Sequence, residues 1–282
     1  MRLFVLLAAF LCASGLYAQK TREIEPAVLE CQYAHWMLRD TLNPSNRTED
    51  LMILRIGKNA SEFFSRYTFY GDSLWNDPQG EKTAARLTLE AVRTRDHSRR
   101  PGARTTNDYI YKNYPKGKMN TYTSLGGISC HLIQEDMPEF EWEMRDSSQV
   151  VCGYTCQLAV TRFRGRNWNA WFTLELPVSD GPWKLGGLPG LILEAYDAAG
   201  HYHYTLVGIR KKDVPPVTFY NYWKKKYEKT ERLDFLRMEV KSLNDPAPMR
   251  TIKEATGIDY GVKYDPNSER RISYDLLERD YR

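Results

Sequence analysis

The chain has 282 residues, with 40 lysines and arginines against 36 aspartates and glutamates, so its formal net charge is +4 at pH 7. Both signs are interspersed, and this near-neutral balance gives no general reason to expect nucleic acid as a partner. One large domain is expected, because no Gly/Ser-rich or proline-rich linker divides the chain.

The first 18 residues have the pattern of a secretory signal peptide. In MRLFVLLAAFLCASGLYA, one arginine precedes an apolar stretch that is too short to span a bilayer, and small residues precede Ala18. We therefore expect cleavage after Ala18, a single mature domain over 19–282, and a periplasmic or secreted location. Cys12 is not expected to be a lipoprotein site, because Leu11 is larger than the residue that normally precedes such a cysteine.

Most of the chain after the signal peptide is predicted to form strands. These segments are rich in β-branched and aromatic residues and are separated by turn residues. The strand over 167–176 has the clearest alternation of apolar and polar residues, although Trp171 falls on its polar face. In chain order, the predicted strands cover 27–38, 51–56, 61–70, 109–114, 118–123, 128–134, 167–176, 190–196 and 201–210.

Two segments have apolar residues at helical spacing. The first is 80–96, and the second begins after Pro215 and Pro216 and continues to 243. These elements predict a mainly β (α+β) fold in which one long and one shorter helix cover a large curved antiparallel sheet, with room for a hydrophobic ligand between them. The charged segment 244–282 is expected to be a surface tail.

Four cysteines remain after the predicted cleavage. An even number in an exported protein favours one or two disulfide bonds, and the sequence does not rank the three possible connectivities. In CGYTC, the two cysteines could bond only in a helical or turn conformation, because a strand would hold their Cα atoms about 13 Å apart. We expect at least one disulfide, with free or metal-bound thiols as the alternative, among Cys31, Cys130, Cys152 and Cys156.

A pair of histidines suggests a metal site as an alternative hypothesis. His201 and His203 are two residues apart on a predicted strand, so their imidazoles would project from one face. Imidazole and thiolate both suit zinc or copper. The competing interpretation is a half-exposed polar strand face, because no third ligand is fixed by local spacing.

FRGRNWNAW, at 163–171, combines two arginines with aromatic residues. Arg164, Arg166 and Trp171 are candidate ligand contacts, because arginine and aromatic side chains can hold a carboxylate or stack on a ring. The simpler interpretation is a hairpin that turns at Gly165.

The segment GPWKLGGLPGLIL, at 181–193, is rich in glycine and proline but poor in reactive groups. We interpret it as a structural joint, in which glycines allow unusual backbone angles and close approach before an apolar run enters the core. Its alternative role is the rim of a ligand pocket, with Trp183 as the contact. The structural motif within it comprises Gly187, Leu188, Pro189, Gly190, Leu191 and Ile192.

Several motifs, taken in their order along the chain, resemble those of the GLPGLI family of exported bacterial proteins. The resemblance implies an uncharacterised periplasmic or outer-membrane-associated protein with a LolA-like open sheet, and a role beside TonB-dependent uptake. It supplies no catalytic residues. It rests on DLMILRIGKNASEFF and GDSL within 50–74, CGYTCQLA (152–159), FRGR (163–166), AWFTLELPV (170–178), GPWK (181–184) and GLPGLI (187–192).

The leading functional hypothesis is a non-enzymatic exported accessory or binding protein. Its expected partner is a hydrophobic or peptide ligand or an outer-membrane protein, and no cofactor is expected. GxSxG, HExxH and the glycine-rich phosphate-binding patterns do not occur. The runner-up is zinc or copper handling through His201, His203 and the cysteines, and a hydrolase with an unrecognised site is the third hypothesis.

Overall fold

The computed structural model describes residues 21–45, 47–74, 78–94, 106–125, 129–221, 224–245, 254 and 274–281. The predicted signal peptide, with Cys12, therefore lies outside the described residues. Within the described ranges, no helix has the length and apolar character needed to cross a membrane.

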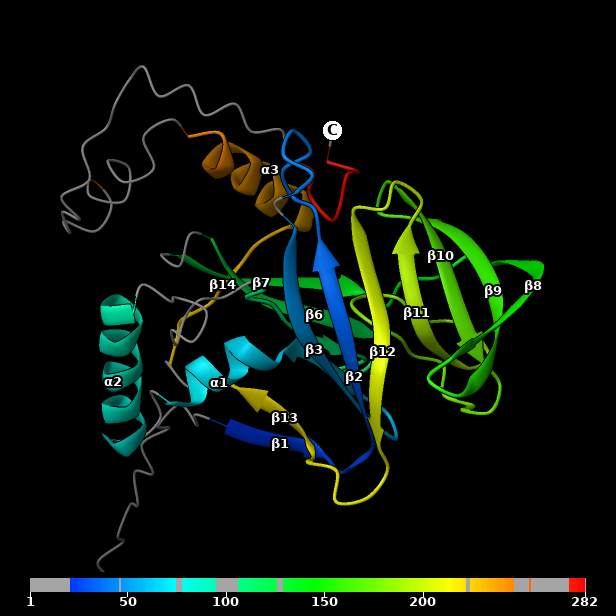
Figure 1. Ribbon diagram of the computed structural model, residues 1–282, viewed down its shortest axis with the longest axis horizontal. Coiled ribbons are helices and arrows are strands. Elements are labelled where there is room, and N and C mark those ends of the chain that lie inside the picture. Colours follow the sequence, from blue (N-terminus) through cyan, green and yellow to red (C-terminus); the bar gives the residue numbers. More distant parts are fainter. Residues whose placement is uncertain are drawn as a thin grey trace, which may run out of the picture.

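A large curved sheet forms the centre of the structure (Figure 1). Its neighbouring strands are antiparallel except for β14, which runs parallel to β7. The sheet is not closed into a barrel, and this confirms the predicted mainly β fold with an open sheet. In sheet order its strands are β14 (Glu228–Lys229), β7 (Ser129–Asp136), β6 (Lys118–Leu125), β5 (Tyr109–Lys112), β4 (Ser61–Ser65), β3 (Thr48–Gly57), β2 (Ala27–Met37), β12 (Tyr202–Arg210), β11 (Leu191–Asp197), β10 (Arg166–Thr173), β9 (Tyr154–Phe163) and β8 (Glu143–Val151).

A second, two-stranded sheet corrects one helix prediction. β1 (Thr21–Glu25) pairs with β13 (Val217–Tyr220), which lies where the long helix was expected to begin. The period of four in this segment was misleading, because Val217, Phe219 and Tyr220 are also good strand formers. Tyr220 packs against Phe64 of β4, so tertiary contacts favour the strand. The helical part of the prediction survives as α3 (Arg232–Leu243).

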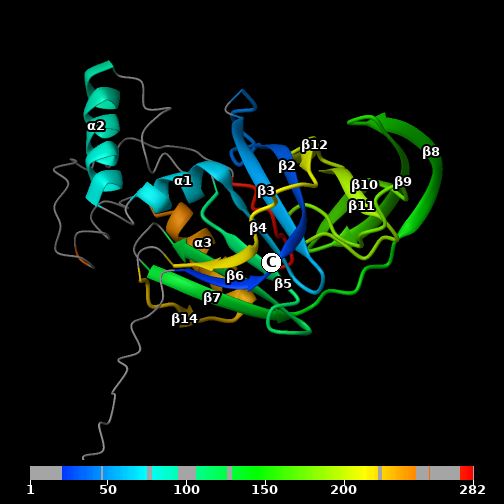
Figure 2. The same ribbon diagram turned by 90° about the horizontal axis from the view of Figure 1, so that it is seen from below.

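The remaining helices lie at one edge of the molecule. α1 (Arg66–Leu74) replaces the second half of the strand predicted over 61–70, because Ser65 Oγ accepts a hydrogen bond from the Thr68 backbone N–H and caps the helix. α2 (Pro78–Thr94) is the helix predicted over 80–96. It lies beside α1 rather than on the sheet, as both views show (Figure 2).

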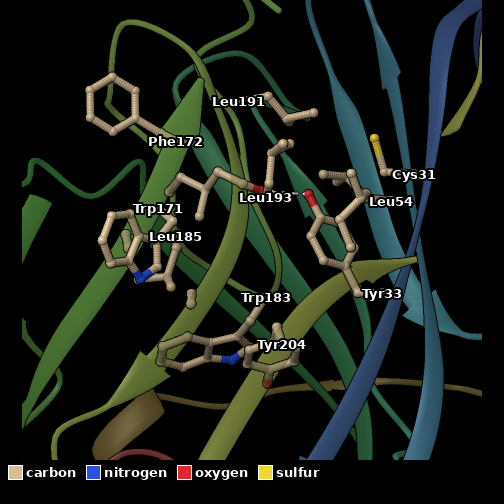
Figure 3. Packing of buried hydrophobic residues seen from close by; sticks show 14 of the residues in the cluster. Cys31, Tyr33, Leu54, Trp171, Phe172, Trp183, Leu185, Leu191, Leu193 and Tyr204 are labelled. Carbon is tan, nitrogen blue, oxygen red and sulfur yellow. Dashed lines mark hydrogen bonds between the residues drawn. The ribbon is translucent and has the colours of Figure 1, made fainter. Parts of the chain in front are cut away.

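Many residues of the main hydrophobic core come from β2, β10, β11 and β12. Figure 3 shows Tyr33, Trp183 and Tyr204 within this core. The Tyr33 hydroxyl donates to the backbone carbonyl of Ile192 at 2.7 Å, so the one polar atom of this fully buried ring is satisfied. Strand β10 contributes Trp168, Ala170 and Phe172 to the core, as the alternation predicts.

The end of the chain differs from the expected surface tail. Asp275, Leu276 and Glu278 are buried, and the backbone N–H of Asp275 donates to the carbonyl of Arg39. Tyr274 forms an isolated antiparallel bridge with Asp40. The charged sequence of this segment suggested a hydrated surface tail, but its carboxylates at Asp275 and Glu278 are buried in ion pairs.

Candidate functional site

The glycine-rich segment 181–193 is held in place by a buried lysine on β5. Lys112 Nζ lies 2.7 Å from Asp180 Oδ1, and it donates to the carbonyls of Gly181 at 2.7 Å and Leu185 at 2.9 Å. Burial lowers the pKa of Lys112, and the Asp180 carboxylate opposes this effect. One ammonium group therefore fixes the start and the middle of the loop.

The predicted structural role of the loop glycines is visible in the backbone. Gly187 has φ +82°, a conformation that side-chain-bearing residues rarely adopt. At Gly190, an added Cβ would lie 2.0 Å from the carbonyl oxygen of Thr173, so only glycine allows this approach. Leu191 and Ile192 follow and are fully buried. The segment is thus a joint that delivers β11 into the core.

A cavity of about 280 Å³ lies between the sheet and α3, where the sequence predicted room for a ligand. Strands β2 to β7 and β12 form one wall, and α3 and residues 276–278 form the other. Figure 1 shows α3 and the C-terminal segment beside this end of the sheet. The volume is near the lower end of the range of small-molecule sites, about 300–1,000 Å³, and suits one apolar group.

Apolar side chains from several elements line most of this cavity. Phe235 and Leu236 face it from α3, which explains why these are the buried residues of that helix. Trp183 reaches it from the glycine-rich loop and packs against Trp168 with ring centroids 5.6 Å apart. The other apolar residues of the lining are Met37, Met52, Phe63, Ile110, Leu125, Ile133, Tyr202, Tyr204, Leu243, Leu276 and Leu277.

Three buried polar atoms in the lining have no hydrogen-bond partner within the described part of the chain: Thr106 Oγ1, Asn107 Oδ1 and Thr121 Oγ1. Thr121 is itself only 4 % exposed. A buried polar atom without a partner costs about 1–3 kcal/mol. These atoms therefore mark a place where the polar part of a ligand would gain hydrogen bonds.

His35 lies in the same lining and is neutral. It is stacked on Tyr204 with ring centroids 4.0 Å apart, and burial lowers its pKa to about 4. Nδ1 lies 2.9 Å from the carbonyl oxygen of His203. Because a carbonyl only accepts, Nδ1 carries the proton and Nε2 is left as an acceptor. Sequence analysis did not single out this residue, which has no local motif.

A dense ion-pair group closes one side of the cavity, and we call it the Lys184 cluster. Lys184 Nζ lies 2.7 Å from both Glu135 Oε2 and Glu278 Oε1. Burial alone would lower the pKa of Lys184, but these carboxylates raise it. Every charge therefore has a partner of opposite sign within the cluster, which consists of Glu135, Arg164, Lys184, Arg232, Glu278 and Asp280.

The predicted ligand residues separate into two groups. Trp183 lines the cavity, whereas Trp171 is buried in the core and is absent from the lining. Arg164 belongs to the Lys184 cluster and lies in the hairpin turn with Gly165, where both have positive φ. Arg166 is 2 % exposed and binds Asp197 and Asp275 at 2.7 Å each. The arginines therefore contact protein carboxylates and attach the C-terminal segment.

The two histidines of the metal hypothesis are held by different carboxylates. His201 Nδ1 lies 2.6 Å from Asp275 Oδ2, and His203 Nε2 lies 2.7 Å from Glu194 Oε1. Across the described ranges, no three His, Cys, Asp or Glu side chains are grouped so as to hold a metal ion. The geometry thus offers these imidazoles as partners of carboxylates, and no observation adds support for zinc or copper.

The expected disulfide is not formed, because all four described cysteines are free thiols. Cys152 is exposed in the turn between β8 and β9, and Cys156 is buried on β9 opposite Gln149. Cys31 and Cys130 lie on β2 and β7, which are five strands apart or about 24 Å along the sheet. The even number of cysteines was a misleading signal, because the fold places three of them on separate strands and Cys152 in a turn.

Comparisons with known proteins add a family match over a short segment. The protein-family model described as "Protein of unknown function (Porph_ging)" matches residues 164–194, which include Trp183 and the glycine-rich loop. Its description does not carry the GLPGLI name, so that resemblance stays a prediction. No curated protein matches the chain.

Two solved structures are similar to part of the chain. "Structure of PNGF-II in P21 space group" has 15 % identity, a TM-score of 0.48, and coverage of 79 % of this chain and 34 % of its own. "Structure of PNGF-II in C2 space group" has 14 % identity, a TM-score of 0.47, and coverage of 76 % and 33 %. The chain spans about a third of the length of these proteins, and a likeness of this degree carries no argument about function.

Proposed function

We propose that this chain is a non-enzymatic binding protein whose cavity between the sheet and α3 takes an apolar group of a ligand. The observation that carries the proposal is the apolar lining of a cavity that also holds unpartnered buried polar atoms. A cavity that served only packing would lose stability at each of these atoms, whereas a bound ligand would offset that cost.

The proposal extends to an accessory role in the cell envelope. Its support is the signal-peptide pattern at the start of the sequence and the resemblance of the motifs to the exported GLPGLI family. A partner in TonB-dependent uptake is part of this proposal. The metal-handling alternative is not carried forward, because no observation favours it over carboxylate-bound histidines.

Native mass spectrometry of the protein purified from the envelope of its own cells tests this function. We expect a retained organic molecule of low mass on the parent protein. The same molecule should be lost from Ile133→Phe, which adds an aromatic ring inside the cavity, and kept by Val207→Phe on the exposed surface of β12. Equal retention by both variants would show that the ligand binds elsewhere, and an unliganded parent would remove the main support for the function.

A further inference from the structure

The charges around the cavity indicate which head group a ligand carries. Arg39 is bound to Glu239 at 2.8 Å, and Lys184 and Arg232 each contact two or more carboxylates of the Lys184 cluster. The three cations of the lining are therefore already paired. A ligand carboxylate or phosphate would have to displace one of these protein carboxylates, so the site does not favour an anion.

Apart from the paired cations, several polar groups of the cavity lining can accept hydrogen bonds from a ligand. Asp108 lines the cavity, and within the described residues its carboxylate forms no ion pair, although the Thr123 hydroxyl donates to it. Its neighbours in sequence and across the strands supply the unpartnered oxygens of Thr106, Asn107 and Thr121. The amide oxygen of Asn107 can only accept a hydrogen bond, and so can an ionised Asp108.

Electrostatics and size together define the occupant. Burial raises the pKa of Asp108, since its carboxylate has been moved out of water without a direct counter-ion. A cation bound beside the Asp108 carboxylate would replace the favourable interaction with water that burial removes. The 280 Å³ of mainly apolar space suits a ring or a branched side chain and leaves no room for a long chain.

We propose that the cavity binds an apolar group that carries a protonated primary amine, with the amine donating to Asp108, Asn107 Oδ1 and the nearby threonine hydroxyls. This chemistry occurs at the N-terminus of a peptide whose first residue is apolar and in small hydrophobic amines. The inference rests on the proposed function and names the ligand class of the same cavity.

Three probes with the same ring and different head groups test the inference. Calorimetric titrations at pH 7 would compare 2-phenylethylamine, 2-phenylethanol and phenylacetate. Because hydrogen bonds to charged groups are worth about 1.5–3 kcal/mol, the amine should bind at least about tenfold more tightly than the alcohol, and the carboxylate should bind most weakly. Equal binding of amine and alcohol would overturn the amine assignment but leave the apolar binding function standing. Binding of none of the three would overturn both.

Titrations with two peptides distinguish a peptide N-terminus from a free small amine as the natural ligand. Phe-Gly-Gly-Gly-amide and its N-acetylated form differ only in the charge and donors of the terminus. Tighter binding of the free peptide than of 2-phenylethylamine assigns a peptide terminus, whereas tighter binding of the small amine assigns a free amine. Equal binding of the acetylated and free peptides would contradict the proposal, since acetylation removes the cation.

A matched pair of variants tests whether Asp108 is responsible for the preference for the amine over the alcohol. Asp108→Asn keeps the size of the side chain and removes its charge, so the preference for amine over alcohol should fall to near unity while alcohol binding is retained. Asp213→Asn makes the same change on the exposed surface and should leave the preference intact. Thermal unfolding of both variants would confirm folding. An unchanged preference in Asp108→Asn would refute the role of this carboxylate.

The inference also predicts a pH dependence. Five charged or titratable groups face Asp108 from the glycine-rich loop, the segment after β2, the C-terminal segment, α3 and β12: Lys184, Arg39, Glu278, Glu239 and Tyr204. Because the pKa of Asp108 is raised, acid protonates this carboxylate at a higher pH than it would an exposed aspartate, and protonation removes the partner of the amine. Amine binding should therefore weaken more than binding of the neutral alcohol as the pH falls through this raised pKa, because titration of His35 and Glu239 in the same lining affects both ligands. A parallel loss of both would contradict the assignment.

Discussion

Lys112 offers the sharpest test of how the glycine-rich loop is held. Its ammonium contacts Asp180 and two loop carbonyls at 2.7–2.9 Å, and its side chain is 6 % exposed. In Lys112→Met the similar apolar stem remains, but the Asp180 carboxylate and the two carbonyls lose their shared donor. Removal of one partner of a buried ion pair typically costs about 3–5 kcal/mol. For a domain of this size that loss corresponds to roughly 6–20 °C in melting temperature.

Urea unfolding followed by circular dichroism would measure this loss. The matched control is Lys118→Met, which breaks the exposed ion pair between Lys118 and Asp136. Exposed pairs contribute about 0–1 kcal/mol, so the control should unfold close to the parent. Equal effects of the two substitutions would refute the assignment of Lys112 as the anchor of the loop.

Two further substitutions test the backbone and the buried histidine. Gly190→Ala should lower the free energy of unfolding markedly, because the added Cβ would lie 2.0 Å from the Thr173 carbonyl oxygen. Gly186→Ala is the control and should be tolerated, since the nearest atom to its Cβ would be 3.6 Å away. Equal melting temperatures for the two variants would contradict the role of Gly190. For His35, the pKa is lowered to about 4, so the unfolded chain takes up a proton near pH 6.5 before the folded protein does. Stability should therefore be complete above pH 6.5 and fall by roughly 3 kcal/mol as the pH drops toward 4, and urea titrations of His35→Phe should show a shallower slope than the parent.

The periodicity of the sequence is a reliable signal only where a strand alternates between buried and exposed residues. In the strand predicted over 167–176, Trp168, Ala170 and Phe172 are buried as their spacing requires, but Trp171 and Thr173 on the opposite face are buried too, so the alternation is kept only in part. The same reasoning failed at 217–220 and 228–229, which form β13 and β14, because aromatic residues at intervals of four suit either a helix or a strand. Pairing of β13 with β1 decided between them, and that is a contact between residues about 200 positions apart.

Of the residues that line the cavity, only Trp183 was predicted from the sequence, and only as the alternative to a structural role for its loop. Asp108 and Thr121 carried no such signal, because they become neighbours only when their strands and α3 pack together. Likewise, nothing local to Arg166 indicated that its partners would be Asp197 and Asp275.

Methyl NMR provides the most direct measurement of the central claim that the cavity between the sheet and α3 binds a ligand. Met37 and Met52 line the cavity, whereas Met144 is 45 % exposed on β8 and lies outside the lining. In protein with 13C-labelled methionine methyl groups, titration with 2-phenylethylamine should shift the Met37 and Met52 signals saturably and leave Met144 in place. Absence of a shift at Met37 and Met52, or an equal shift at Met144, would contradict the account.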